Sequence, residues 1–462
     1  MPVLPPRVVI AGTHSGAGKT TVATGLLAAL AGRGVRVGAA KVGPDFIDPG
    51  YHSLACGRPS RNLDLRLCGR DAVLAVAGRA AAECQLLVVE GVMGLFDGAG
   101  SGSEASTADV ATLLDAPVVL VVDAAAMSGS VAALVHGFRS LDPAVRVEAV
   151  VLNRVGSDGH ERLLRDALDP LGLPVLGALR RDDRLTWRDR HLGLIPVAER
   201  PGEVRVALAA LAELVADRVD LEGVVALART AGPLVAADLP APPPVQGRPV
   251  VALAGGPAFS FTYPELPEAL AAAGADVVAF DPRHDTALPE EANALIAGGG
   301  FPEVFAAELA ANEPLLADVR RRVGAGLPTW AECGGLLWLA RSLDCCPLAG
   351  VVPADGRMTD HLTLGYRAAL TRMPSPLGPA GTALQGHEFR YSDLDPPGDA
   401  LDIAGRFGQG RAGFATTTLL ATYLHIHPAG EPAAVAAFVG TAARAATRSV
   451  SRPPSPEVAQ GG

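Results

Sequence analysis

The chain has 462 residues, of which 49% are hydrophobic and 19% are charged. This composition excludes an intrinsically disordered protein, and the length predicts two or three domains with substantial cores. The net charge of −10 disfavours nonspecific nucleic-acid binding, which needs a positive surface field.

Sequence signals for membranes and secretion are absent from the chain. It has no stretch of about 18 uninterrupted apolar residues, so we expect no membrane span. The first residues, MPVLPPRVVIAGTHSG, lack the basic and apolar regions of a signal peptide. Six cysteines without a CxxC pair argue against a disulfide scaffold and a zinc ribbon, so we predict a cytoplasmic protein with free thiols.

The first half alternates short apolar runs with helical stretches. Residues 7–11 (RVVIA) form an apolar run that ends at a glycine, and residues 21–31 place several apolar side chains on one helical face. The other strand candidates are rich in Val and Leu, as buried parallel strands are: 35–41, 86–90, 117–123, 147–153 and 175–179. This alternation predicts a doubly wound, mostly parallel α/β sheet over residues 1–235.

A Pro-rich segment, residues 236–248 (AADLPAPPPVQGR), is predicted to be a semi-rigid linker. A second β/α series follows it, with strand candidates at 250–254, 277–280, 294–297 and 327–332. From about Gly350 the pattern becomes β-like and rich in turns. We therefore predict a second domain over residues 249–446 and a disordered tail over 447–462.

The first candidate site is a glycine-rich loop between the first strand and the first helix. Residues 12–20 read GTHSGAGKT, which supplies the GK[ST] end of a phosphate-binding loop in the strand–loop–helix context that this motif requires. Thr13 stands where the motif usually has its first glycine. The alternative is a glycine-rich turn that only links the strand to the helix.

This loop predicts how ATP would be held. Backbone N–H groups would wrap its phosphates, Lys19 would reach the β- and γ-oxygens, and the Thr20 hydroxyl would ligate Mg²⁺. Asn153, which ends a later strand, is a candidate to hydrogen-bond the base, with a plain turn residue as the alternative. The predicted nucleotide-binding residues are Thr13, Ser15, Gly16, Gly18, Lys19, Thr20 and Asn153.

Acidic residues at the ends of strands are the candidate metal ligands. Asp45 and Asp48 follow a strand in KVGPDFIDP, and Glu90 ends the apolar run LLVVE as a Walker-B-type acid would. Asp97 and Asp123 also follow strands, and any one of these acids could instead cap a helix or face solvent. Open α/β sheets bind ligands at the carboxyl ends of their strands. The predicted Mg²⁺ ligands are Thr20, Asp45, Asp48 and Glu90.

The second candidate site is a cysteine at a strand-to-helix turn. Residues 328–338 read PTWAECGGLLW, in which an apolar strand runs into Cys333, two glycines and then a helix. This pattern is typical of a nucleophile elbow, where the helix N-terminus favours a thiolate and the Gly334 N–H helps to stabilise an oxyanion. The alternative, a buried structural cysteine, is our interpretation of Cys56, Cys68, Cys84, Cys345 and Cys346.

A thiolate nucleophile needs a base, and histidines near the end of the chain offer one. His425 and His427 stand in TYLHIHP, and both would face the same side of a strand, so periodicity does not choose between them. The glycine turn AGGGFPE, which contains Gly299 and Gly300, could provide a second oxyanion donor. His387 in GHEFRYS is a candidate to line a substrate pocket. His14 could touch phosphate, and the other histidines, including His52, are interpreted as surface or core residues.

Together these motifs resemble the cobyrinic or hydrogenobyrinic acid a,c-diamide synthases of cobalamin biosynthesis. The resemblance rests on GTHSGAGKT, KVGPDFIDP and VEGVMGLFDG in the first half and on GGGFPE, AECGG, GHEFRYS and YLHIH in the second. It implies an ATP-dependent synthetase domain, similar to the dethiobiotin synthetase branch, fused to a class I glutamine amidotransferase α/β domain. The implied activity is that of a ligase which amidates the a and c side-chain carboxylates of the corrin ring.

The resemblance also implies roles for individual residues. Cys333 would attack glutamine and release ammonia through a thioester, with His425 as the base because the family's Y-x-H pattern places the catalytic histidine first. ATP would phosphorylate a substrate carboxylate, and ammonia would displace phosphate from the acyl phosphate. The implied substrate and oxyanion residues are Tyr51, His387, Gly299, Gly300 and Gly334. We expect ATP, glutamine and a corrinoid as partners, no nucleic acid or membrane, and a homodimer as one candidate assembly.

The chain departs from most class I amidotransferases at one position. They have a Glu two residues after the catalytic histidine, where this chain has His427 followed by Pro428. The sequence therefore leaves open which group orients His425. The vitamin B12 amidotransferases share this loss, so we do not interpret it as inactivation.

Other functions remain as alternatives. Cobyric acid synthase and nickel-sirohydrochlorin a,c-diamide synthase are the closest, although GPDFIDP and GHEFRYS favour the a,c enzyme. A deviant P-loop switch ATPase would carry a signature Lys early in the loop, where this chain has Ala11, Gly12 and Thr13. A regulatory protein with an inactive amidotransferase domain is disfavoured because Cys333 and His425 are both present. The cobalt content of the corrinoid is left open, and the GC-rich composition favours cobalt-free hydrogenobyrinate.

Overall fold

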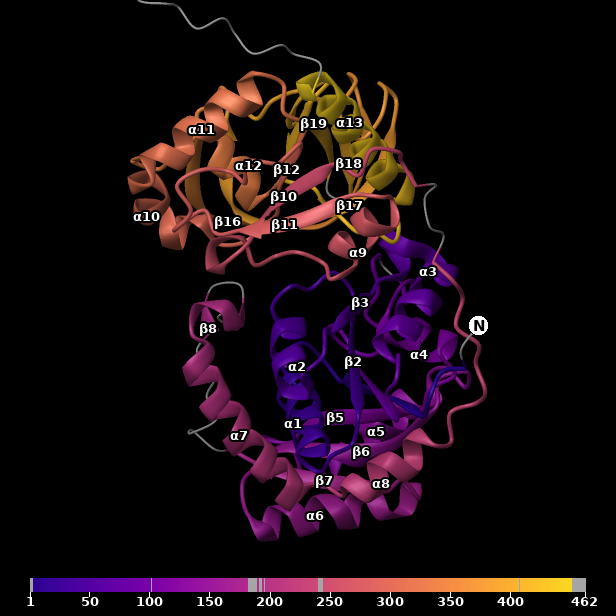
Figure 1. Cartoon of the computed structure of the whole chain (residues 1–462). Coiled ribbons are helices and arrows are strands. Elements are labelled where there is room, and N and C mark those ends of the chain that lie inside the picture. The colour runs from indigo at the N-terminus through magenta and orange to yellow at the C-terminus, as the bar shows by residue number, and fades with distance from the viewer. Residues whose placement is uncertain are drawn as a thin grey trace, which may run out of the picture. The chain divides into compact units, whose positions relative to one another are not determined.

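The computed structural model describes residues 3–100, 102–181, 189–190, 193–194, 196–239, 244–406 and 408–450. The chain divides into two compact units, Met1–Pro240 and Ala241–Gly462 (Figure 1). The division falls inside the Pro-rich segment 236–248 that the sequence predicts as a linker, and residues 240–243 of that segment lie outside the described residues. Each unit has its own hydrophobic core.

The first unit is built on a sheet with the strand order β3-β2-β4-β1-β5-β6-β7. Its strands are β1 (Arg7–Gly12), β2 (Val37–Val42), β3 (Arg61–Leu63), β4 (Leu86–Glu90), β5 (Val118–Asp123), β6 (Val147–Val155) and β7 (Val175–Arg180). All neighbouring pairs are parallel, which confirms the predicted sheet. The sequence did not predict β3, because its residues RNL form no apolar run.

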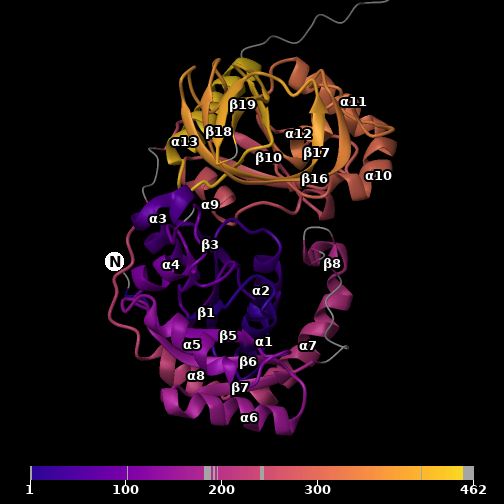
Figure 2. The ribbon, with the colours of Figure 1, turned by 180° about the vertical axis from the view of Figure 1, so that it is seen from behind.

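Helices cover both faces of this sheet (Figure 2). They are α1 (Lys19–Gly32), α2 (Asp48–Cys56), α3 (Leu65–Ala80), α4 (Thr107–Leu113), α5 (Ser130–Ser140), α6 (Asp158–Leu168), α7 (Pro201–Arg218) and α8 (Leu221–Ala228). Val8 and Ile10 of β1 share a core with α1, α7 and α8. Val9 and Ala11 point to the opposite face and are also fully buried, so the sheet is covered on both sides. A short hairpin, β8 (Asp189–Arg190) and β9 (Gly193–Leu194), precedes α7.

The second unit contains a mainly parallel sheet with the order β11-β10-β12-β13-β21-β20. Its strands are β10 (Val250–Ala254), β11 (Asp276–Phe280), β12 (Ala294–Ala297), β13 (Thr329–Glu332), β20 (Phe414–Thr416) and β21 (Leu419–Thr422). Only the edge pair β20–β21 in this sheet is antiparallel. The helices are α9 (Glu265–Ala272), α10 (Ala306–Ala311), α11 (Glu313–Gly324), α12 (Gly334–Leu339) and α13 (Pro432–Val450). The second predicted α/β series is therefore present.

A second sheet in this unit accounts for the turn-rich pattern after Gly350. It has the order β15-β14-β16-β17-β22, and β18 and β19 extend it from β16. The strands are β14 (Ser342–Leu343), β15 (Cys346–Pro347), β16 (Asp355–Thr371), β17 (Ala383–Asp395), β18 (Leu401–Gly405), β19 (Gly408–Ala412) and β22 (His425–Ile426). Among the described residues, no helix is both long and apolar enough to cross a bilayer.

The last helix, α13, is part of the core of the second unit. Phe438 is fully buried and meets the Trp330 ring of β13 edge to face, with the ring centroids 5.8 Å apart. The helix continues to Val450, so the predicted tail over 447–462 begins too early; residues 451–462 lie outside the described residues. Helix formation continues because residues 441–448, TAARAATR, contain neither Gly nor Pro.

The contact between α13 and β13 predicts a measurable loss of stability. Phe438→Ala would leave a cavity beside Trp330 and should lower the free energy of unfolding of the second unit by about 3–5 kcal/mol. Chemical denaturation followed by tryptophan fluorescence measures this change. Val304→Ala, at a side chain that is 43% exposed in the same unit, should change it by less than about 0.5 kcal/mol. Equal effects of the two substitutions would contradict this packing.

Candidate active sites

The phosphate loop joins β1 to α1 through two glycines in left-handed conformations. Gly16 and Gly18 have φ angles of 80° and 99°, which side-chain-bearing residues rarely adopt. A Cβ on Gly18 would also lie 1.9 Å from Nδ2 of Asn153. The loop therefore closes tightly over the helix N-terminus, where backbone N–H groups face an incoming anion.

Lys19, the first residue of α1, is almost fully buried against this loop. Its Nζ donates a hydrogen bond to the His14 carbonyl at 3.2 Å. Burial, with the nearby Lys41 ammonium, lowers the pKa of Lys19 to about 8, although surrounding carboxylates oppose this shift. A bound phosphate would stabilise the cationic form, so the site is electrostatically suited to an anion.

Thr20 meets two of the predicted acids. Its hydroxyl donates to Glu90 Oε1 at 2.6 Å and lies 3.3 Å from Asp48 Oδ2. Lys41 of β2 bridges the same two carboxylates, with its Nζ 2.7 Å from Asp48 and 2.8 Å from Glu90. The ends of β2 and β4 and the start of α2 are thereby held together beside the phosphate loop.

Glu90 is fully buried and has a further partner in His52. The His52 Nε2 atom lies 2.6 Å from Glu90 Oε2, and His52 is itself 1% exposed. Burial alone would raise the pKa of Glu90, but Lys41 and His52 outweigh it and hold that pKa well below its usual range. Glu90 is therefore an anion at neutral pH.

Asp45 shapes the segment that leads into α2. Its Oδ1 accepts the N–H groups of Ile47 at 2.8 Å and Asp48 at 3.0 Å. Burial and the neighbouring Asp48 carboxylate raise the pKa of Asp45 to about 7. Asn62 of β3 fixes the same segment by donating to the carbonyls of Gly43 and Asp45. Asp45 is thus engaged with backbone donors, whereas Asp48 points to Thr20 and Lys41.

The oxygen atoms beside the loop fit a magnesium ion bound with a nucleotide. Among the described residues, no three His, Cys, Asp or Glu side chains gather closely enough to hold a metal by themselves. Mg²⁺ usually needs only one or two carboxylates, because phosphates and water complete its octahedron. The Thr20 hydroxyl with the Asp48 and Glu90 carboxylates supplies such a set of hard oxygen donors.

The other predicted residues of this unit have different surroundings. Asn153 of β6 donates from Nδ2 to the Ala17 carbonyl at 3.0 Å, so it holds the phosphate loop in place. Tyr51 is 3% exposed within α2. Asp97 accepts the Gly94 N–H at 2.8 Å, and Asp123 is paired with an arginine, so neither joins the carboxylates at Thr20. Roles for Asn153 and Tyr51 toward ligands stay predictions.

Cys333 lies at the sharp turn between β13 and α12, where the sequence predicts an elbow. Its backbone has φ 45° and ψ −99°, a strained conformation for a side-chain-bearing residue. The turn needs glycine behind the cysteine, because a Cβ on Gly335 would lie 2.1 Å from the Ala297 carbonyl oxygen. Cys333 is 6% exposed, and its Sγ lies 3.9 Å from the Phe389 carbonyl of β17.

The predicted glycine turn packs against both the elbow and His425. A Cβ on Gly334 would lie 3.1 Å from the Gly300 nitrogen, and one on Gly299 would lie 2.4 Å from Cε1 of His425. A Cβ on Gly300 would lie 2.2 Å from the Ala258 carbonyl oxygen. These approaches bring the predicted oxyanion glycines next to Cys333, and the space tolerates no larger residue.

His425 of β22 is fully buried beside the cysteine. Its Nδ1 lies 3.6 Å from Oε2 of Glu332, the residue that precedes Cys333. Burial by itself would lower the pKa of His425, but Cys333 and Glu332 outweigh it and raise that pKa to about 10. The ring is therefore suited to accept the thiol proton and to remain a cation beside the sulfur.

The structure distinguishes the two histidines that periodicity could not. Strand β22 ends at Ile426, and His427 begins a turn in which its Nδ1 accepts the Ala429 N–H at 3.2 Å. His387 of β17 stacks on His425 with ring centroids 5.0 Å apart and is only 1% exposed. Burial, with the neighbouring histidines, holds the pKa of His387 well below its usual value, so this ring is neutral. The role of His387 toward substrate stays a prediction.

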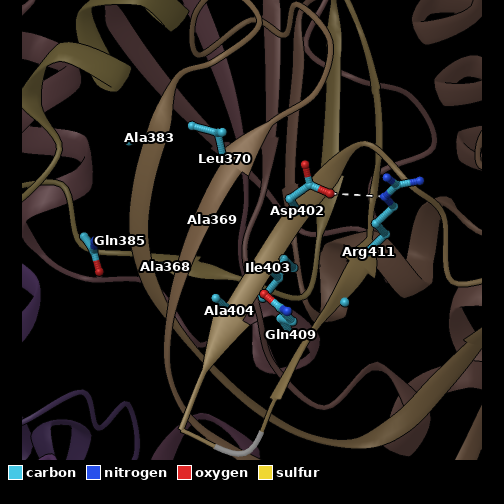
Figure 3. Close-up of a pocket in the computed structure, with 11 residues that line it drawn as sticks. Ala368, Ala369, Leu370, Ala383, Gln385, Asp402, Ile403, Ala404, Gln409 and Arg411 are labelled. Carbon is cyan, nitrogen blue, oxygen red and sulfur yellow. Dashed lines mark hydrogen bonds and ion pairs between the residues drawn. The ribbon is translucent and has the colours of Figure 1, made fainter.

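A cavity of about 550 Å³ lies on the antiparallel strands of the second unit (Figure 3). Its walls come from β16 to β19 and are mainly alanine, leucine and isoleucine side chains, with Gln385 and Gln409 among the polar groups. Asp402 and Arg411 also line it, and Arg411 Nε donates to Asp402 at 3.1 Å. Cys333, His425 and Glu332 do not line this cavity, so it is separate from the cysteine site.

Sequence reasoning missed three residues that complete these sites. Lys41 opens the segment KVGPDFIDP, and a lysine within a buried strand could have been recognised as a partner for acids. His52 was interpreted as a surface or core residue and is a core residue bound to Glu90. Glu332 stands at the end of an apolar strand directly before the cysteine, where a charged side chain was a usable signal.

Comparisons with known proteins identify a domain family in each of the two units. Residues 8–195 match the CobQ/CobB/MinD/ParA nucleotide binding domain family, and residues 250–433 match the CobB/CobQ-like glutamine amidotransferase domain family. The chain is 50% identical to the hydrogenobyrinate a,c-diamide synthase of Streptomyces coelicolor, over 94% of this chain and 97% of that protein. The enzyme of the same name from Thermobifida fusca is 47% identical, over 94% and 96%. The cobyrinate a,c-diamide synthase of Syntrophotalea carbinolica is 42% identical, over 94% and 98%.

These matches confirm the resemblance that the motifs indicate. The two domain families occur in the predicted order, and each match lies within one of the two units. The curated relatives align along nearly their full lengths and at identities far above 30%. The chain therefore belongs to the family of hydrogenobyrinate and cobyrinate a,c-diamide synthases.

Proposed function

We propose that this chain is an amidoligase that uses ATP and glutamine to amidate the a and c side-chain carboxylates of a corrinoid. One observation carries this proposal: a phosphate loop beside buried carboxylates and a cysteine elbow beside a histidine occur in one chain that is 50% identical to a hydrogenobyrinate a,c-diamide synthase. The two sites have complementary chemistry, since one activates a carboxylate and the other releases ammonia.

The cysteine site would release the ammonia. Cys333 passes its thiol proton to His425, and the thiolate attacks the side-chain amide carbon of glutamine. His425 then returns the proton to the leaving nitrogen as the C–N bond breaks, which gives ammonia and a thioester. Water hydrolyses the thioester to glutamate and restores the thiol. The raised pKa of His425, about 10, favours the cation that this transfer needs.

Backbone donors would stabilise the oxyanion that forms during this attack. The Gly334 N–H lies at the start of α12, and the Gly300 nitrogen lies beside it across the elbow. Donors that are held in place before the reaction stabilise developing charge most effectively. The close contacts of Gly299 and Gly300 support this role, because they leave the turn little freedom to move.

The phosphate loop would activate the substrate carboxylate. A carboxylate oxygen attacks the γ-phosphorus of ATP, ADP leaves, and an acyl phosphate forms. Ammonia then bonds to the acyl carbon and loses a proton as phosphate departs. Lys19 would hold the transferred phosphoryl group, and the oxygens of Thr20, Asp48 and Glu90, which lie together, would hold magnesium. Magnesium, when bound, would neutralise charge on the β- and γ-phosphates.

Hydrogenobyrinate is the substrate that the comparisons favour. The relatives at 45–50% identity are named hydrogenobyrinate a,c-diamide synthases, whereas those named for cobyrinate are 40–42% identical. We therefore propose the cobalt-free ring as the preferred substrate, in agreement with the composition argument.

The substrate proposal predicts the outcome of a direct assay. Purified protein with ATP, Mg²⁺ and glutamine should convert hydrogenobyrinate to its diamide with a kcat/KM at least about 10-fold above that for cobyrinate. Mass spectrometry of the corrinoid measures both products. A preference for cobyrinate would reverse the assignment of the ring, and no amidation of either ring would contradict the proposed function.

If the cysteine site only releases ammonia and the phosphate-loop site performs the amidation, removing the nucleophile should affect only the glutamine-dependent reaction. Cys333→Ser should lower glutamine-dependent amidation by about 10³-fold or more, because the hydroxyl is a far weaker nucleophile at this site. Amidation from ammonium chloride should stay within about twofold of the wild-type rate, since the synthetase chemistry needs no thiol. The exposed Cys345, substituted in the same way, is the matched control and should leave both rates unchanged. Loss of both activities in Cys333→Ser would contradict the assignment of ammonia release and amidation to two separate sites.

Removing a carboxylate beside the phosphate loop should instead impair amidation from both nitrogen sources. Glu90→Gln keeps the side-chain shape but removes the charge that pairs with Lys41, and it should lower amidation from glutamine and from ammonia equally, by about 10²-fold. Initial rates with saturating ATP measure the effect, and circular dichroism checks the fold. Glu148→Gln, at a surface carboxylate of the same unit, is the control. Unimpaired amidation in Glu90→Gln would remove Glu90 from the ATP site.

A further inference from the structure

Glu332 occupies a position between the cysteine elbow and the histidine strand. Its Oε1 accepts the backbone N–H of Ile426 at 3.1 Å, and its Oε2 lies 3.6 Å from Nδ1 of His425. One carboxylate therefore uses one oxygen to hold the backbone of β22 and turns the other toward the ring of the preceding residue. Its side chain is 12% exposed, so water does little to weaken these contacts.

The backbone around Glu332 holds this arrangement in register. Glu332 is the last residue of β13 and pairs with Thr422 of β21, and the Cys333 N–H donates to the Thr422 carbonyl at 2.8 Å. The chain from Thr422 reaches His425 within three residues. The nucleophile and the carboxylate are thus tied to β13 and β21, and the base follows β21 within three residues, which limits their relative motion.

Three other titratable groups near His425 have different chemistry. Cys333 is the nucleophile itself, and His387 is a neutral ring stacked on His425. His427, which stands where most class I amidotransferases have a glutamate, uses Nδ1 to accept the Ala429 N–H and packs 4.2 Å from the Tyr263 ring centroid. None of these three can act as an anionic partner for Nδ1 while Cys333 reacts.

We propose that Glu332 is the positioning residue for His425 and takes the place of the glutamate that follows the histidine in most class I amidotransferases. This inference rests on the proposed glutaminase step and deepens it. The carboxylate holds the proton on Nδ1, so Nε2 is the nitrogen that receives the Cys333 proton and later gives it to the leaving ammonia. Hydrogen bonds of this kind are often long without substrate and shorten in the reacting complex.

The carboxylate also stabilises the charge that His425 gains. Transfer of the thiol proton creates a thiolate and an imidazolium, and an anion beside Nδ1 lowers the energy of that pair. Without this anion the thiolate should form only at a higher pH. The direction follows because a less basic histidine competes less well for the thiol proton.

Glu332→Gln tests this role with a nearly isosteric side chain whose amide oxygen can still accept the Ile426 N–H. Glutamine-dependent amidation should fall by about 10²-fold, mainly in kcat, while ammonia-dependent amidation stays within about twofold of wild type. Iodoacetamide alkylation of Cys333, followed across pH by mass spectrometry, should shift to a pH about one unit higher. Glu332→Asp keeps the charge and should lose less activity than Glu332→Gln.

A matched control distinguishes a positioning role from a structural one. Glu431 is a partly buried carboxylate of this unit, and its Oε1 accepts the Gln385 N–H at 2.8 Å. Glu431→Gln should leave the alkylation profile unchanged. An unchanged profile in Glu332→Gln, or equal loss of both amidation activities, would overturn the inference. Alkylation needs no corrinoid, so failure of the proposed substrate assignment would leave this test intact.

Discussion

The ion pair between Lys41 and Glu90 organises the first unit's site. A buried charge is costly unless it is partnered, and Glu90 at the end of β4 has no exposed surface. Lys41 on the neighbouring strand β2 supplies the countercharge at 2.8 Å, and the same ammonium reaches Asp48 at the start of α2. With these charges balanced, the Thr20 hydroxyl can donate to Glu90, and carboxylates lie beside the phosphate loop. The ATP chemistry that we propose depends on this balance.

A backbone constraint has the corresponding role in the second unit. Cys333 is held in a strained conformation at the end of β13, and the structure tolerates it because Gly335 lets α12 approach β12 closely. The same crowding presses Gly299 against His425. Each of these contacts is possible only because glycine has no side chain. The close packing at these glycines holds the Cys333 sulfur and the His425 ring in place. Reactivity in this unit therefore depends on packing as much as on charge.

Much of both units follows from local pattern. Val- and Leu-rich runs predict parallel strands because such strands are buried on both faces, and the loop GTHSGAGKT predicts its own strand–turn–helix setting. The sequence pattern did not predict the strand Arg61–Leu63, because these residues form no apolar run. It also missed the end of α13, where the helix continues without an apolar stripe. The strand Arg61–Leu63 forms because it pairs with β2, and the end of α13 stays helical because it contains neither Gly nor Pro.

By itself the sequence determined the family, the two-unit order, the phosphate loop and the cysteine elbow, because each is encoded by adjacent residues. Only the tertiary structure decided which distant side chains meet. It brought His52 to Glu90 and Glu332 to His425, and it placed His427 after the end of β22, where its Nδ1 accepts the Ala429 N–H. The reason is physical: strand pairing and burial choose partners across long stretches of chain, and a linear pattern carries no information about that pairing.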